Sequence, residues 1–125
     1  MKVSELEGAL LDYWVARADE RPLSSEWDCA GADGILIGTG AGDLERFAPS
    51  TDWAHGGPII DRVPFGIFER VDGGWAAGIY QPQQGMRDLC VAYQAGDTLL
   101  IAAMRAYVAS KFGDEVPDGE ARKNG

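Results

Sequence analysis

The hydrophobic positions between Leu99 and Phe112 predict a long helix near the end of the chain. On a helical wheel, apolar and small residues occupy almost every side of this stretch. Asp97 or Thr98 is suited to cap the first turn, and Gly113 is suited to the left-handed position that often follows a helix. A helix that is apolar nearly all round must be covered on several sides, so we expect it to be the central element of the fold. Its buried residues should include Leu100, Ile101, Met104, Val108 and Phe112.

Arg105 is the charged exception within this helix, because it shares a face with Ile101 and Val108. A guanidinium group that leaves from an apolar face needs a carboxylate, a set of carbonyl oxygens or a ligand anion, since an unpaired buried charge is costly. A structural ion pair is the ordinary explanation, and a ligand anion is the functional alternative. We expect Asp52 to be the partner, because a carboxylate accepts both arms of a guanidinium group.

A first helix is predicted from a capping box, the sequence SELE at residues 4–7. In this motif the serine accepts the N–H of the glutamate and the glutamate bonds back to the N–H of the serine, so a helix should begin at Ser4. Apolar residues then recur at helical spacing through Leu10 and Trp14. Pro22 and the polar residues after it should end this helix.

Short apolar runs in the middle of the chain predict strands, one at residues 35–37 and three more at 63–71, 75–80 and 89–93. Asp72 and Gly73 have the chemistry of a primed hairpin turn, whose backbone requires positive φ. Residues 81–87 read as a longer loop. The predicted fold class is α+β: a small antiparallel sheet, made of the hairpin and one or two further strands, packed against an N-terminal and a long C-terminal helix. We expect one domain at 1–117 and a mobile polar tail at 118–125.

The glycine-rich sequence GTGAG at residues 38–42 invites comparison with a phosphate-binding loop. No lysine follows it, however, and no long amphipathic helix opens there. We therefore interpret this stretch as a flexible connection.

Composition and charge narrow the classes of partner. The chain has 125 residues and a formal net charge of −9, which argues against direct nucleic-acid binding and against an anionic membrane surface but permits a basic partner. Cys29 and Cys90 have no neighbouring Cys or His, so we expect free thiols and no metal site. No cofactor motif is present, and the chain opens on a predicted helix instead of a signal peptide, so we expect a cytoplasmic protein without a cofactor. The sequence leaves the oligomeric state open and is compatible with a homodimer.

Residues 49–60 concentrate unusual side chains, including the single histidine of the chain, His55. Asp52 is a natural turn former, Trp53 offers a stacking surface, and Gly56 with Gly57 allows a close approach of backbone or ligand. In the structural alternative this is an ordered loop whose tryptophan fills the core and whose histidine bonds a carbonyl. In the functional alternative it is a binding loop.

Three blocks of sequence carry a family resemblance: VSEL with Gly8 and LD at residues 3–12, STDWA with GGPII at 50–60, and LIAAMR running on through VAS to GDEVP at 100–117. Together and in this order they resemble the NinX family of small phage proteins, whereas residues 27–47 do not contribute. The resemblance implies a bacteriophage or prophage accessory protein and supplies no catalytic residues. His55 stands where a glutamine is expected, and the residue after Thr98 is not the expected proline. The family's motif blocks fall on Asp52, Trp53, Gly56, Gly57, Pro58 and Arg105.

The sharpest functional hypothesis is a non-enzymatic module that binds a small anionic or nucleotide-like ligand. In a phage such a module would serve to sequester a host defence signal. The alternative is an acidic interaction protein that docks on a host or phage enzyme and modulates it. An enzyme is the least supported class, because Asp52 and His55 form the only acid–base pair in view and no nucleophile stands in a recognisable motif. The predicted ligand-binding residues are Asp52, Trp53, His55, Gly56, Gly57 and Arg105, with no catalytic and no metal-binding residue.

Overall fold

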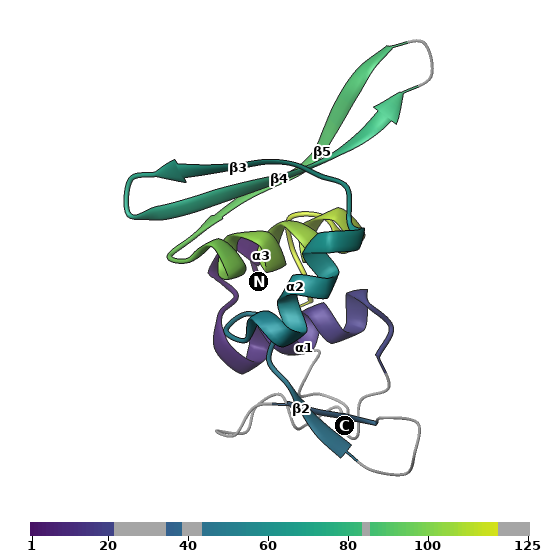
Figure 1. The fold of residues 1–125 in the computed structure, drawn as a ribbon, viewed down its shortest axis with the longest axis vertical. Coiled ribbons are helices and arrows are strands. Elements are labelled where there is room, and N and C mark those ends of the chain that lie inside the picture. The colour runs from purple at the N-terminus through teal and green to yellow at the C-terminus, as the bar shows by residue number, and fades with distance from the viewer. Residues whose placement is uncertain (22–34, 39–43, 84–85, 118–125) are drawn as a thin grey trace.

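Helix α3 (Leu99–Phe112) lies between a three-stranded sheet and helix α1 (Gly8–Ala18) in the computed structural model, which describes residues 1–21, 35–38, 44–83 and 86–117 (Figure 1). One side of α3 packs on strands β4 (Gly74–Gln83) and β5 (Met86–Gly96), and another side packs on α1. The predicted central helix is therefore confirmed, and so is the α+β class. Both helices lie on the same side of the sheet, with α1 beyond α3 (Figure 1).

The predicted ends of α3 are confirmed as well. The side chain of Thr98 accepts the N–H of Ile101, and Gly113 follows the helix with a φ of 90°. Burial agrees with the prediction for most of the helix, but Phe112 is 40% exposed and Ile101 is only partly buried. Phe112 lies in the last turn, where its ring meets Trp14 edge-on and leaves its other side open. The buried residues of α3 are Leu100, Ala102, Ala103, Met104, Ala106, Tyr107, Val108 and Ala109.

The sheet is antiparallel in the order β3-β4-β5, with β3 at Phe65–Val71. The predicted hairpin is confirmed, although its turn is not the primed type I′ turn, because Gly73 has positive φ and Asp72 does not. The predicted loop at residues 81–87 is wrong. β4 continues to Gln83 and β5 begins at Met86, so the two strands project beyond β3 as a long arm (Figure 1). Pro82 is tolerated in β4 because this part of the strand pairs with β5 alone, and the pairing is irregular between Gln81 and Gln83.

The predicted helix start at Ser4 is also wrong. Residues Val3–Glu5 form a 3₁₀ turn, η1, and α1 begins only at Gly8, whose preceding residue makes no side-chain cap. The N-terminal segment is held by a distant part of the chain, because the N–H of Val3 bonds the carbonyl of Asp114 and Lys2 pairs with Glu115. This long-range pairing prevails over the local capping signal.

Residues 53–60, predicted as part of a loop, lie in a helix instead: α2 spans Trp53–Arg62 and contains Pro58. Asp52 caps it by accepting the N–H of Ala54. Glycine and proline disfavour a helix, but Ile59 is fully buried and anchors α2 to the core. Tertiary packing therefore overrides the local propensity.

A second, two-stranded sheet pairs β1 (Ile35–Gly38) with β2 (Leu44–Phe47). β1 was predicted from its apolar run, and β2 was not. Three predictions fall on residues or side chains outside the described part of the chain: the mobile tail at 118–125, the connection at 39–42, and the free thiols of Cys29 and Cys90.

Candidate functional site

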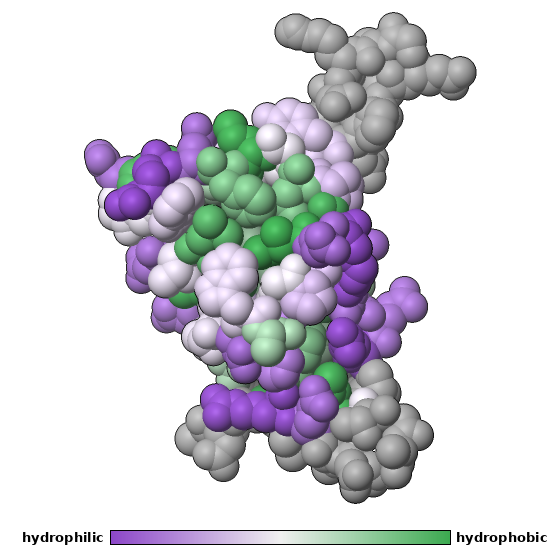
Figure 2. Space-filling view, in the orientation of Figure 1, coloured by the Kyte–Doolittle hydropathy of each residue, from purple (hydrophilic) through white to green (hydrophobic). Residues whose placement is uncertain are grey.

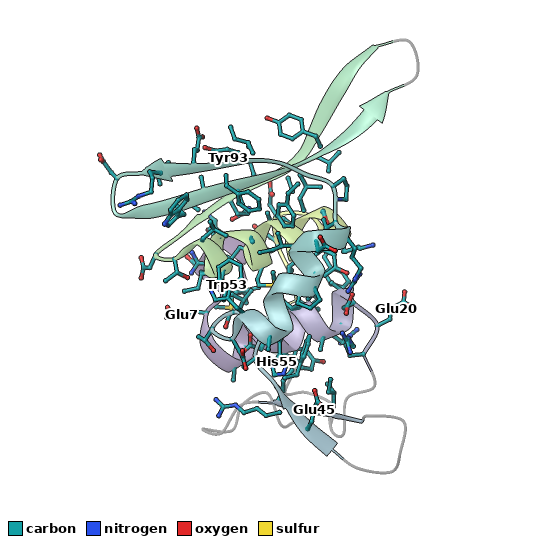
Figure 3. All side chains as sticks on the ribbon, viewed as in Figure 1. Glu7, Glu20, Glu45, Trp53, His55 and Tyr93 are labelled. Atoms are coloured by element: carbon teal, nitrogen blue, oxygen red, sulfur yellow. The ribbon has the colours of Figure 1, made fainter. Side chains whose placement is uncertain are left out.

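An open cleft lies between the beginning of α2 and the beginning of α3. It has a volume of about 240 Å³, and we call it the Trp53 cleft. The indole of Trp53 is 57% exposed, the largest exposed fraction among the large hydrophobic side chains described. Figure 3 labels Trp53 on α2, and Figure 2 shows hydrophobic residues gathered on the same face of the molecule. The lining residues are Ser50, Thr51, Trp53, Thr98, Leu99, Leu100 and Ile101.

The cleft receives the N-terminal ends of two helices. The carboxylate of Asp52 caps α2 with a distance of 2.9 Å to the N–H of Ala54, and the hydroxyl of Thr98 caps α3 with a distance of 3.1 Å to the N–H of Ile101. The first N–H groups of a helix have no partner within it, and they carry the positive end of the helix dipole. An anionic group in this cleft would therefore be favoured electrostatically.

Ser50 provides the most buried polar atom in the lining. Its side chain is 2% exposed, and its hydroxyl makes no hydrogen bond of normal geometry within the described residues. Its backbone N–H donates to the carboxylate of Asp12 over 2.9 Å. Burial raises the pKa of Asp12, and the hydrogen bonding from Ser50 opposes this shift only in part. The Ser50 hydroxyl is therefore enclosed beside the Asp12 carboxylate and is not exposed to the cleft.

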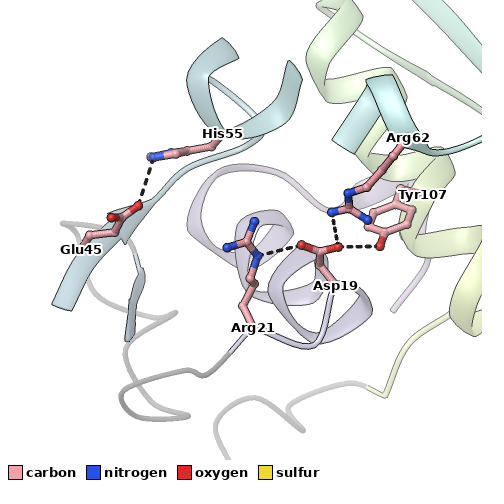
Figure 4. A network of polar contacts seen from close by, with 6 residues as sticks. All are labelled: Asp19, Arg21, Glu45, His55, Arg62 and Tyr107. Atoms are coloured by element: carbon pink, nitrogen blue, oxygen red, sulfur yellow. Dashed lines mark hydrogen bonds and ion pairs between the residues drawn. The ribbon is translucent and has the colours of Figure 1, made fainter. Parts of the chain in front are cut away.

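His55 holds α2 to the end of β2. Its Nδ1 atom accepts the N–H of Ala48 over 3.0 Å, and its Nε2 atom lies 3.8 Å from a carboxylate oxygen of Glu45 (Figure 4). Asp52 lies 3.7 Å from Nδ1, so the two residues are neighbours as the sequence suggested. Because Nδ1 accepts a backbone N–H, it carries no proton in this arrangement. The imidazole therefore serves as a hydrogen-bond acceptor for the backbone instead of one half of an acid–base pair.

The two glycines of α2 have different roles. A Cβ atom on Gly56 would lie 2.5 Å from the carbonyl oxygen of Pro49 and 2.6 Å from Leu100, so only glycine fits where α2 meets α3. A Cβ atom on Gly57 would meet only Trp53, at 3.8 Å. The expected close approach is thus confirmed at Gly56, where it serves packing. Neither glycine lines the Trp53 cleft.

Arg105 lies apart from this cleft. Its guanidinium group donates to two backbone carbonyls, that of Leu6 and that of Ala95, each over 2.8 Å. The expectation that Arg105 needs acceptors is correct, but the predicted pairing with Asp52 is wrong. Arg105 leaves α3 on the side that faces η1 and β5, whereas Asp52 lies at the start of α2. The arginine instead lines a separate shallow depression beside Asp72 and Asp97.

A polar cluster that the sequence analysis missed surrounds Asp19 (Figure 4). Its carboxylate accepts hydrogen bonds from Arg21 over 2.7 Å, from Arg62 over 2.5 Å and from Tyr107 over 2.9 Å. Burial alone would raise the pKa of Asp19, but these three donors together lower it below the ordinary value. The cluster joins the end of α1 to α2 and α3, three elements whose proximity no local pattern reveals.

A family model described as Bacteriophage P22, NinX matches residues 2–111 of the chain. The chain belongs to the NinX family. The match includes residues 27–47, which carried none of the resemblance seen in the sequence, and both helices that form the Trp53 cleft. No curated protein matches the chain significantly. Within the described part of this NinX protein, no cluster of three or more metal-binding side chains occurs and no helix is long and apolar enough to cross a membrane.

Proposed function

We propose that this NinX protein is a non-enzymatic binding module for a small, anionic, nucleotide-like ligand, and that the Trp53 cleft receives the ring of that ligand. The observation that carries the proposal is the exposed indole of Trp53 beside a cavity at the N-terminal ends of two helices. A tryptophan this exposed leaves a large apolar surface in water, and stacking on a base or similar ring would cover it.

The size of the cleft limits the part of the ligand that enters it. Clefts that enclose drug-sized ligands measure about 300–1,000 Å³. The Trp53 cleft, at about 240 Å³, is smaller, so a single ring system enters and the rest of the ligand stays outside. Stacking of a base on an aromatic side chain contributes about 1–3 kcal/mol. The hydroxyls of Thr51 and Thr98, both exposed in the lining, are suited to fix the orientation of the ring.

The predicted site residues have different roles under this proposal. Trp53 contacts the ligand, whereas Asp52, His55 and Gly56 hold α2 in position through capping and packing. Gly57 and Arg105 have neither role. Asp52 is half exposed and its negative charge opposes an anion at the cleft. Asn keeps the capping oxygen and removes the charge, so Asp52→Asn should tighten binding of an anionic ligand about twofold to fivefold, corresponding to about 0.3–1 kcal/mol.

The proposal is tested by isothermal titration calorimetry with adenosine and with adenosine monophosphate as probes. We expect saturable binding with one site per chain, tighter for the monophosphate. Trp53→Ala should weaken both probes about tenfold or more. Tyr93→Ala is the matched control, since it removes another exposed ring, 48% exposed on β5. Equal weakening by both substitutions, or undiminished binding to Trp53→Ala, would contradict the proposal.

The second candidate is an acidic protein that docks on a host or phage enzyme. The observation that favours it is the cleft lining, in which Leu99 and Ile101 lie beside the exposed Trp53 on a chain of net charge −9. The calorimetric experiment separates the two candidates. Failure of the wild-type protein to bind either probe at millimolar concentration favours docking, and saturable binding favours the ligand module. In the phage setting, a ligand module would act by sequestering a host signal.

A further inference from the structure

A second pocket lies at the opposite ends of α2 and α3, and we call it the Arg62–Lys111 pocket. It has a volume of about 220 Å³ and forms where the last turns of both helices approach β4. Its lining combines two cations and two hydroxyls with an apolar wall, and it includes no acidic residue. The lining residues are Arg62, Val63, Pro64, Ile79, Tyr107, Ser110 and Lys111.

The local charge is opposite to that of the whole chain. The protein carries a formal net charge of −9, yet the cations Arg62 and Lys111 line this pocket, and Asp19 is the carboxylate that bonds Arg62. These two positive charges and one negative charge leave +1. A positive balance attracts a phosphate monoester, which carries about −1.5 to −2 near neutral pH.

Arg62 is held in place for a ligand by its contact with Asp19. The Nη2 atom of its guanidinium group bonds the carboxylate, while the side chain remains half exposed at the pocket. A guanidinium group has five N–H donors, so the contacts with Asp19 and with the Tyr107 hydroxyl leave donors for a further acceptor. The charge of Asp19 is already shared with Arg21 and Tyr107, which reduces its repulsion of an anion.

Lys111 completes the cationic side of the pocket. Its ammonium group lies 5.9 Å from the centre of the Tyr107 ring, near the outer limit of a cation–π contact, and the side chain is exposed at the pocket. A cation in the last turn of a helix also interacts favourably with the negative end of the helix dipole, which accounts for either residue alone and opposes an anion at the same place. That ordinary explanation does not account for the convergence of Arg62 and Lys111 on one cavity.

We propose that the Arg62–Lys111 pocket is an anion site that binds a phosphate group. The apolar wall of Val63, Pro64 and Ile79 closes one side of the pocket, and the two exposed cations lie at its polar side. Arginine with lysine is a pairing suited to phosphate oxygens. This site is separate from the Trp53 cleft and does not depend on the function proposed for that cleft.

The test is a titration of the ¹⁵N-labelled full chain with inorganic phosphate at constant ionic strength, followed by ¹H–¹⁵N correlation spectra. We expect saturable shifts of the amides near residues 62–64 and 107–111. Arg62→Gln and Lys111→Gln should each weaken phosphate binding about tenfold. Arg70→Gln is the matched control, because it removes one positive charge from β3 at an exposed position away from the pocket.

The possible outcomes distinguish a specific phosphate site from general electrostatic attraction. Shifts that do not saturate, or equal weakening by Arg70→Gln, overturn the proposal. Acetate that binds as tightly as phosphate overturns the assignment to phosphate. Circular dichroism checks that each variant is folded. Because Lys111 is exposed and makes no ion pair within the described residues, Lys111→Gln keeps the test decisive if Arg62→Gln fails to fold.

Discussion

Substitution of the two neighbouring glycines of α2 by alanine should have opposite effects on stability. Both residues lie inside the helix, where alanine is favoured over glycine by about 1 kcal/mol. At Gly57 the new methyl group meets only Trp53 at an ordinary contact distance of 3.8 Å. Gly57→Ala should therefore raise the free energy of unfolding by about 0.5–1 kcal/mol.

At Gly56 the same methyl group has no room. It would lie 2.5 Å from the carbonyl oxygen of Pro49, which belongs to the backbone, and 2.6 Å from Leu100 on α3. Overpacking of a core typically costs about 1–3 kcal/mol, and at this contact we expect the upper part of that range. After the gain in helix propensity is subtracted, Gly56→Ala should lower the free energy of unfolding by about 1–2 kcal/mol.

Urea denaturation followed by circular dichroism measures both variants under the same conditions. The predicted difference between them is about 1.5–3 kcal/mol, a shift that urea denaturation resolves. Equal stability of the two variants, or a Gly56→Ala protein as stable as the wild type, would refute the close packing of α2 on α3. It would also remove the rigid spacing on which the Trp53 cleft depends.

The remaining predictions concern buried polar contacts. Arg105→Met should lower the free energy of unfolding by about 1–3 kcal/mol, because two backbone carbonyls lose a charged donor; urea denaturation measures it, and an unchanged midpoint would contradict the role assigned to this residue. His55→Leu should cost about 1–3 kcal/mol by leaving the N–H of Ala48 unpaired, whereas His55→Gln, which keeps an acceptor, should cost less in the same assay. The pKa of Asp19 is lower in the folded protein than the unfolded value of 3.8, so its carboxylate stabilises the fold above pH 3.8. This stabilisation is lost as pH falls through the folded-state pKa, and Asp19→Asn should remove that loss from an acid-unfolding curve. The pKa of Asp12 is raised instead, so its effect has the opposite sign: stability declines as pH rises from 3.8 through the folded pKa, and Asp12→Asn should abolish this decline.

The elements predicted correctly from the sequence are those whose local and tertiary preferences agree. α3 combines apolar positions on nearly every side with a capping threonine and a terminal glycine, and the structure keeps all three features. α2 was missed because Gly56, Gly57 and Pro58 disfavour a helix locally, while the burial of Ile59 against the core favours one. In each case the packing energy decides the structure. A local sequence pattern predicts an element correctly only when packing favours the same element.

The candidate sites follow the same rule. Trp53 was predicted from its chemistry, and the structure places it on an open cleft. The need of Arg105 for hydrogen-bond acceptors was predicted correctly, but their identity was not. Helix periodicity indicates on which face of a helix a side chain lies, and it does not indicate which other element packs against that face. The Arg62–Lys111 pocket was missed entirely, since its cations lie at the ends of two helices that are distant in sequence.

The most direct test of the proposed function follows the indole N–H signals of the protein during a titration with adenosine monophosphate. The chain has four tryptophans, and ¹H–¹⁵N spectra resolve one such signal for each, with the Trp53 signal assigned from the Trp53→Phe variant. We predict a saturable shift of the Trp53 signal, while the signal of the buried Trp14 stays in place. A Trp53 signal that does not move at millimolar nucleotide, or an equal shift of both signals, would contradict binding in the Trp53 cleft.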